Sequence, residues 1–276
     1  MKVSTDDDRT GGQPDRVPPL DETWIRALLE ENGARVPRLD VRERTTSTNT
    51  NLAEAAKAED IPEGAVVVAA TQSAGRGRLG RVWESPPGTL SFSILLKPPV
   101  AAMPFASFVV ALAVAEAIQA TSGVSAALKW PNDVVSGAGK LSGLLAERAG
   151  DGVVVGCGVN VGVPAADLDV PGASSLADLG GDVSREELLV ACVGRIQRLT
   201  SVWSDASYSA TASGLLDRYR GNCVTLGQSV VVMLPDDTEV RGQAKDVDES
   251  GRLLVTTSSG EVAVDAGDVV QARTDA

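Results

Sequence analysis

The chain has 276 residues, 43% of them hydrophobic, which is enough for one large domain with a sizeable core and a small companion. Its formal net charge of −12 argues against a general affinity for nucleic acid, because such binding depends on cationic contacts to phosphate. Histidine is absent, which excludes Ser-His-Asp and Cys-His nucleophile systems and histidine metal sites. An enzyme with this composition must act by placing anions, or on substrates that are already nucleophilic.

The amino terminus and the cysteines indicate the compartment. Residues 1–19 are acidic, polar and rich in Gly and Pro, so we expect a disordered tail and not a secretory signal. The three cysteines, Cys157, Cys192 and Cys223, are widely separated and fit reduced thiols better than a disulfide frame. We expect no membrane span, because the longest apolar run is interrupted by Glu116. These features predict a cytoplasmic protein.

Two short elements open the folded part of the chain. Residues 21–32 predict an amphipathic helix closed by Gly33, with Trp24, Leu28 and Leu29 on its apolar side. Residues 39–44 predict a strand, and a helix that starts around Thr50 follows it, capped by Thr48 or Asn49. Hydroxyl and backbone N–H groups at such a helix start suit a carboxylate ligand, although they are equally typical of plain caps.

Residues 71–83, TQSAGRGRLGRVW, which we call the Gly/Arg loop, follow a strand predicted at 65–70. Glycines allow close approach of a ligand, and arginines supply planar forks of donors for carboxylate and phosphate. The dinucleotide-binding fingerprint also matches, but it requires a helix after the third glycine, and the sequence that follows predicts a turn and a strand. The remaining alternatives are a mobile anion-binding loop and a solvated basic surface loop.

The middle of the chain predicts an antiparallel meander. A strand at 89–97 and a buried helix at 104–123 precede β-like runs that end at residue 160, joined by short turns. Lys and Arg total 25, and only six of these are Lys. Two of the six, Lys129 and Lys140, border the meander, either because a compact ammonium is needed there or as surface residues placed by chance.

The last third predicts a change from helices to strands. A loop at 163–183 leads to a capping box, Ser184-x-x-Glu187, for a helix through about Trp203, and another helix ends near Arg220. From residue 225 onwards five short runs alternate with a period of two between turns. This pattern is typical of a small β-barrel, which we expect to be a separate domain.

Five motifs occur in a characteristic order. They are STN at 47–49, GRGRLGRVW at 75–83, KWPND at 129–133, GKLSGLLAE at 139–147 and GCGVN at 156–160. With the small barrel after them, the chain resembles the biotin protein ligases over residues 39–273, in the short form without a DNA-binding repressor domain. The resemblance implies an α+β fold, with a disordered tail (1–19), a class II aminoacyl-tRNA synthetase-like catalytic domain (20–222) and an SH3-like β-barrel (223–273).

The resemblance also implies the chemistry and the residues that carry it. Biotin and ATP, with Mg²⁺, would give biotinoyl-5′-AMP, and a lysine of the biotin carboxyl carrier domain of acyl-CoA carboxylases would accept the biotinoyl group. The implied biotin-binding residues are Ser47, Thr48, Asn49, Gln72, Gly75, Arg76, Gly77, Arg78, Lys140 and Gly143. The implied ATP-binding residues are Arg78, Arg81, Trp83, Asn132, Asp133 and Asn160, with Asp133 as a candidate for Mg²⁺, and the implied catalytic residues are Lys140, Arg78, Lys129 and Asp133.

Partners and alternatives follow from the same motifs. The expected partner is the carrier domain, with no DNA and no membrane, and an exposed sheet edge leaves open whether two copies pair. A lipoate ligase is the nearest enzymatic alternative. A biotin-sensing repressor would need a DNA-reading domain in the first 40 residues, which are acidic, and an inactive ligand-binding module is the third alternative.

Overall fold

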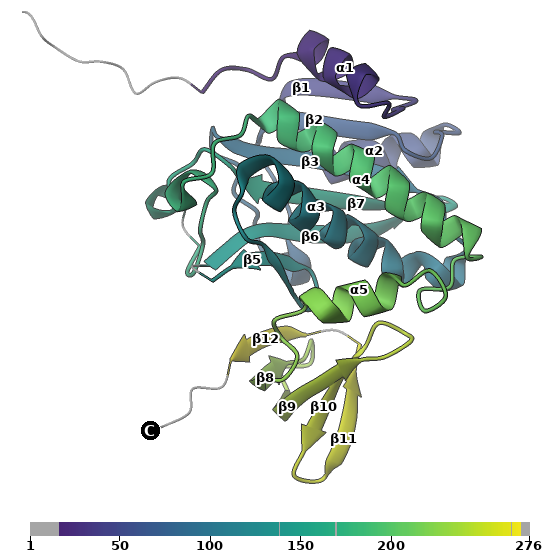
Figure 1. The fold of residues 1–276 in the computed structure, drawn as a ribbon, viewed down its shortest axis with the longest axis vertical. Helices are drawn as coiled ribbons and strands as arrows, with labels where there is room; N and C mark the ends of the chain where they lie inside the picture. Colours follow the sequence, from purple (N-terminus) through teal and green to yellow (C-terminus); the bar gives the residue numbers. More distant parts are fainter. Residues whose placement is uncertain (1–16, 138, 169, 266, 272–276) are drawn as a thin grey trace, which may run out of the picture.

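Two β-sheets follow each other along the chain in this computed structural model, which describes residues 17–137, 139–168, 170–265 and 267–271 (Figure 1). The first sheet has the strand order β1-β2-β3-β7-β6-β5-β4. Its strands are β1 (Leu39–Thr45), β2 (Val66–Gln72), β3 (Thr89–Leu96), β4 (Ala127–Lys129), β5 (Asp133–Ser136), β6 (Gly139–Ala149) and β7 (Gly152–Asn160). Only β1 and β2 pair in parallel, and the predicted antiparallel meander from β4 to β7 is confirmed.

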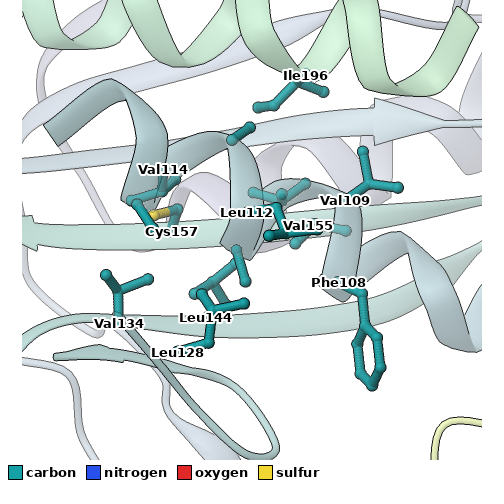
Figure 2. Close-up of a cluster of buried hydrophobic side chains, with 14 of the residues drawn as sticks. Phe108, Val109, Leu112, Val114, Leu128, Val134, Leu144, Val155, Cys157 and Ile196 are labelled. Atoms are coloured by element: carbon teal, nitrogen blue, oxygen red, sulfur yellow. The ribbon is translucent and has the colours of Figure 1, made fainter. Parts of the chain in front are cut away.

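Helices cover both faces of this sheet. On one face α3 (Ala106–Ser122) and α4 (Arg185–Asp205) pack side by side, and apolar side chains of α3 meet those of β4–β7 there (Figure 2). The opposite face carries α2 (Thr48–Ala58), whose Leu52 packs with Val154 of β7. Because strand residues alternate between faces, Val155 and Cys157 belong to the α3 side, whereas Val154, Gly156 and Gly158 face α2.

The sequence prediction about membrane spans needs a correction. A 3-10 turn (Val100–Phe105) and α3 together form 23 residues, Val100–Ser122, whose most apolar 18-residue window has a mean hydropathy of 2.0, which meets the length and composition of a span. The run includes Glu116, which is partly exposed and pairs with Arg218. Of the most apolar window, 72% is buried inside the protein, so this segment is the core helix of the domain.

The first two helices differ from prediction in detail. Helix α1 (Glu22–Glu31) begins after its N-cap Asp21 as expected, but Ile25 and Leu29 are its buried residues and Trp24 is 40% exposed. Helix α2 is capped by Ser47, whose side chain accepts a hydrogen bond from Thr50 N, and not by Thr48 or Asn49. The cap one residue earlier leaves the side chains of Thr48 and Asn49 free for tertiary contacts.

The helices after the sheet follow the prediction closely. The loop at 163–183 contains 3-10 turns at Ala165–Asp167 and Ala177–Leu179. Ser184 and Glu187 form the predicted capping box of α4, and α5 (Leu215–Asn222) leads into the second sheet. Cys157, Cys192 and Cys223 are buried free thiols, as expected.

The second sheet is small and fully antiparallel, with the order β11-β10-β9-β8-β12. Its strands are β8 (Ser229–Met233), β9 (Glu239–Val247), β10 (Leu253–Thr257), β11 (Gly260–Val264) and β12 (Asp268–Gln271), which confirms the five predicted strands. Trp130, 1% exposed, joins the two sheets: its backbone N–H donates to Thr225 Oγ1 (3.0 Å) and its Nε1 donates to Gly251 O (3.1 Å). A single hydrophobic cluster therefore runs from α3 into the second sheet.

The division into domains at residue 222 stays a prediction. Residues 1–16 of the expected disordered tail lie outside the described residues. Residues 17–19 are described, and Arg185 donates a hydrogen bond to Pro18 O.

Candidate functional site

One cavity of about 1000 Å³ lies on the α2 face of the first sheet and extends to the second sheet. Glycines make room for it. A Cβ at Gly156 would lie 2.2 Å from Asn49 Oδ1, and one at Gly158 would lie 2.2 Å from the Trp83 ring. Because neither position carries a side chain, the start of α2 and the end of the Gly/Arg loop approach the strand backbone directly.

The structure brings most of the predicted site residues into the wall of this cavity. They are Ser47, Thr48, Asn49, Gln72, Arg76, Gly77, Arg78, Arg81, Trp83, Lys129, Asn132, Asp133, Lys140 and Gly143. Two predicted residues lie outside that wall. Gly75 packs under the backbone of Trp83, where a Cβ would meet Trp83 O at 2.4 Å. Asn160 is 3% exposed, and its Nδ2 donates to Ser174 O (3.0 Å) and Lys140 O (3.4 Å).

The α2 end of the cavity is an organised polar pocket. Gln72 Oε1 accepts from Thr48 N (2.8 Å), and Gln72 Nε2 donates to Ser85 Oγ (2.9 Å). Ser93 Oγ lies 2.8 Å from both Thr48 Oγ1 and Asn49 Oδ1. These bonds fix the directions of the hydroxyl and amide groups before any ligand arrives.

The Gly/Arg loop folds as a short hairpin. Gly77 N donates to Arg81 O (2.8 Å), Trp83 N donates to Gly75 O (2.9 Å), and Arg76 and Val82 form an antiparallel bridge. A 3-10 turn, Arg78–Gly80, closes its tip, and Gly80 has a φ of 74° that only glycine adopts readily. The next element after Gly80 is the strand β3 and not a helix, so the dinucleotide-binding alternative lacks its structural context.

The three arginines of the loop have different partners. Arg76 Nη2 pairs with Glu147 Oε2 (2.8 Å), and Arg81 Nη2 pairs with Asp268 Oδ1 (2.7 Å). Arg78 Nη1 instead donates to two neutral oxygens, Asn132 Oδ1 (3.2 Å) and Gly267 O (3.4 Å). Burial lowers the pKa of Arg78 from its usual value, because a half-buried cation loses hydration. Arg78 is therefore the arginine best prepared to receive an anion.

Lys140 supplies a second positive charge from β6. Its Nζ lies 2.7 Å from Asp133 Oδ1 and 5.6 Å from the centre of the Trp83 ring. Its backbone is held from the 163–183 loop, because Lys140 N donates to Gly172 O (2.7 Å) and Ser174 N donates to Lys140 O (2.9 Å). The ammonium group is therefore fixed in the cavity between a carboxylate and an aromatic face.

Two carboxylates of the site were missed by sequence reasoning. Glu147 Oε2 accepts from both Asn49 Nδ2 (2.8 Å) and Arg76 Nη2 (2.8 Å), so it links the polar pocket to the loop. Glu147 is the last residue of the motif at 139–147, and this position could have identified it as a site residue. Asp268 lies in the second sheet, 187 residues from Arg81, and nothing in the local sequence marks it.

The comparisons with known proteins agree with these features. Residues 41–163 match the Biotin/lipoate A/B protein ligase family, and residues 225–270 match the Biotin protein ligase C terminal domain. The chain is 38% identical to a biotin--[acetyl-CoA-carboxylase] ligase of Mycobacterium tuberculosis, over 93% of this chain and 97% of that protein. It is 34% identical to the Paracoccus denitrificans protein of the same name, over 82% of this chain and 97% of that protein.

A solved structure extends the agreement to the fold. The biotin protein ligase from Aquifex aeolicus, in complex with biotin and ATP, superposes with a TM-score of 0.73 at 27% identity, covering 86% of this chain and 100% of that chain. Sequence identity over nearly the whole length, both family matches and the shared fold lead to one conclusion. The chain belongs to the biotin protein ligase family.

Proposed function

We propose that the protein is an ATP-dependent biotin protein ligase. It activates biotin as biotinoyl-5′-AMP, with release of pyrophosphate, and transfers the biotinoyl group to a lysine of a biotin carboxyl carrier domain of acyl-CoA carboxylases, with release of AMP. The observation that carries the proposal is a single cavity that joins the polar pocket at α2 to Lys140 and Arg78. The two bacterial relatives are named as ligases of acetyl-CoA carboxylase, which supports the carrier as the acceptor.

The cavity offers each part of the two substrates a matching surface. The polar pocket of Ser47, Thr48, Asn49 and Gln72 suits the hydrogen-bonding ring of biotin, and Gly143 and Gly158 leave space along the sheet. Lys140 would reach the biotin carboxylate and the α-phosphate, and Arg78 would reach the phosphates. Trp83 is proposed to stack near the adenine, and Asn132, Asp133 and Asn160 to contact the nucleotide.

The first step requires alignment and charge neutralisation more than acid–base chemistry. Biotin's carboxylate is ionised at neutral pH, so it can attack the α-phosphorus without a general base. Lys140 and Arg78 hold the two anions together and stabilise the charge that spreads over the phosphate oxygens. This chemistry accounts for a ligase site without histidine.

The second step needs an uncharged amine on the carrier. Asp133, which lies in the cavity 2.7 Å from Lys140 Nζ, is proposed to take a proton from the incoming lysine. Lys129, at the end of β4 on the cavity wall, is proposed to assist in the nucleotide or the acceptor step.

Magnesium would enter with ATP. The described residues contain no group of three or more acidic, His or Cys side chains able to hold a metal by themselves. One carboxylate, Asp133, fits the usual protein contribution to Mg²⁺ bound mainly by phosphates, and the ion would neutralise phosphate charge.

The proposal also covers the fold type of each sheet, the pairing of two copies and the cellular compartment. The mixed sheet with helices supports a class II aminoacyl-tRNA synthetase-like domain, and the small antiparallel sheet supports an SH3-like barrel. The edge strand β1 would pair with a second copy or stay free, whereas the edge of β4 is already paired within the chain, where Val224 N donates to Leu128 O (2.8 Å). We propose action in the cytoplasm on a carrier protein, without a DNA or membrane partner.

The decisive test is biotin-dependent exchange of pyrophosphate into ATP, since it isolates the first step and needs no carrier. We expect exchange with biotin, ATP and Mg²⁺, and its loss in Arg78→Ala. Preference for lipoate over biotin would select the lipoate-ligase alternative, and a salt-sensitive shift of operator DNA would select the repressor. Purified protein that forms no adenylate from biotin and ATP would overturn the proposal.

A further inference from the structure

The Gly/Arg loop is fastened to the second sheet, which supplies none of the residues that the motifs assign to the site. Arg81 Nη2 pairs with Asp268 Oδ1 at 2.7 Å, and Arg78 Nη1 donates to the neighbouring Gly267 O at 3.4 Å. Both acceptors lie at the start of β12, where that strand borders the cavity. The Gly/Arg loop and the second sheet therefore meet at two adjacent residues, Gly267 and Asp268.

Arg81 also controls the backbone that carries Arg78. Its Nε donates to Arg78 O (3.3 Å), and its backbone N–H donates to the same oxygen (3.1 Å), which closes the 3-10 turn at the tip of the loop. One guanidinium thus contacts both the carbonyl of Arg78 and the carboxylate of Asp268. Holding Arg81 in place holds Arg78 in place.

A carboxylate on the wall of an anion site opposes binding unless a cation neutralises it. Asp268 lies on the cavity wall, and Arg81 is the cation that pairs with it. The charge of Arg81 is therefore neutralised by Asp268. Arg78 Nη1 donates to two neutral oxygens, so the charge of Arg78 can neutralise a ligand.

We propose that Asp268 is a positioning residue of the adenylation site: through Arg81 it holds Arg78 in the cavity for the phosphates of ATP. The inference rests on the proposed function and changes the part assigned to Arg81 from a nucleotide ligand to a link between the loop and the second sheet. The second sheet thereby takes part in the first step without contributing a group that binds ATP.

The size of the effect follows from the exposure of the pair. The side chain of Arg81 is 59% exposed and that of Asp268 is 33% exposed, so solvent screens their attraction. Loss of an exposed pair of this kind changes an equilibrium by about two- to fivefold. The test must therefore resolve a small change and separate it from general loosening of the second sheet.

Asp268→Asn is the test variant, and Asp246→Asn is its matched control. Asp246 also forms an ion pair with a residue outside the second sheet, since its Oδ1 lies 2.9 Å from Arg220 Nε of α5. This pair does not involve the Gly/Arg loop. Arg220 keeps two hydrogen bonds to Val247 O (2.9 and 2.7 Å) in that variant. Both variants remove one carboxylate charge from the second sheet, and only one of them touches the Gly/Arg loop.

Two measurements read the position of the loop. In ligand-free protein, trypsin should cut after Arg76, Arg78 and Arg81 about two- to fivefold faster in Asp268→Asn than in wild type, because the loop is released more often. In pyrophosphate exchange, KM for ATP should rise by a similar factor of about two to five, with kcat at saturating ATP and KM for biotin unchanged. Asp246→Asn should match wild type in both.

A double-mutant cycle completes the test. Arg81→Gln should raise KM for ATP, and adding Asp268→Asn to it should raise KM no further, because the link between the two residues is already lost. Unchanged cleavage or unchanged KM in Asp268→Asn, equal effects in Asp246→Asn, or a fall in kcat alone would each overturn the proposal. If wild type shows no exchange, the ligase proposal fails, while the cleavage rates still decide whether Asp268 holds the loop.

Discussion

Single residues shape this site as much by absent side chains as by charged ones. Gly143 and Gly158 lie opposite each other on β6 and β7, and the Trp83 ring rests on both of them. Lys140 Nζ occupies the same neighbourhood, 3.1 Å from the position of a Cβ at Gly143. The aromatic face and the ammonium can approach the sheet only because these two positions are glycine.

Gly158→Ala tests this packing. The added methyl would lie 2.2 Å from the Trp83 ring, and relieving such an overlap costs about 1–3 kcal/mol. We expect a lower free energy of unfolding and slower biotin-dependent exchange, both measured against Gly162→Ala, where the nearest atom is 4.0 Å away. Wild-type stability and exchange in Gly158→Ala would contradict this account of the site.

Lys140→Ala tests the fixed ammonium. The variant removes the charge proposed to bridge carboxylate and phosphate and leaves Asp133 without its 2.7 Å partner, so exchange should fall by about 10²–10³. Lys140→Arg should not restore it, because a guanidinium is larger than the ammonium packed against Trp83. Lys97→Ala is the control, since Lys97 pairs with Asp60 and Asp151 outside the cavity. Near-normal exchange in Lys140→Ala would refute the assigned role.

At the scale of elements, α4 shows how local chemistry sets a helix start. Ser184 Oγ accepts from Glu187 N (3.1 Å) and Ser184 N donates to Glu187 Oε2 (3.1 Å). The side chain of each residue therefore hydrogen-bonds the backbone N–H of the other. Ser184→Ala should lower the free energy of unfolding by about 1 kcal/mol, as measured by urea denaturation. A change within error would show that tertiary packing alone fixes the start of α4.

The same capping box predicts a dependence on pH. Hydrogen bonds from the Ser184 hydroxyl and backbone hold the pKa of Glu187 below its usual value. A carboxyl with a lowered pKa stabilises the folded chain above its unfolded pKa of about 4.3, and this contribution is lost as the pH falls through the folded pKa. The stability difference between wild type and Glu187→Gln should therefore be larger at neutral pH than in acid. A difference that grows on acidification would contradict the assigned sign.

At the scale of the whole molecule, Trp130 connects the two sheets. The hydrophobic cluster contains residues of both sheets, and the Trp130 side chain is buried between them with its Nε1 on Gly251 O. Because the core is continuous, we expect the wild-type protein to unfold in one cooperative transition.

Trp130→Ala should break that connection. Truncating a buried tryptophan costs about 3–5 kcal/mol, and we expect the loss to separate the thermal transition into two or to lower its midpoint strongly. Trp24→Ala, on the partly exposed side of α1, is the matched control and should change the midpoint little. A single transition with an unchanged midpoint in Trp130→Ala would show that the sheets are stabilised independently.

Much of the fold could be predicted because its causes are local. The capping box spans three residues, the strands of the second sheet show a period of two between turns, and the meander is joined by short glycine turns. The motif residues were predicted from the resemblance, and most of them do line one cavity. Where local signals were ambiguous the prediction failed, as with the α2 cap at Ser47 and the partly exposed Trp24.

By itself the sequence determined which groups can act: arginines, lysines and amides in ordered motifs, with no histidine to serve as a base. Only the tertiary structure decided which carboxylates hold those cations. Glu147 lies 71 residues from Arg76, and Asp268 lies 187 residues from Arg81. The physical reason is that side chains so far apart meet only after the sheets have packed, and such pairing leaves no periodic trace in the chain.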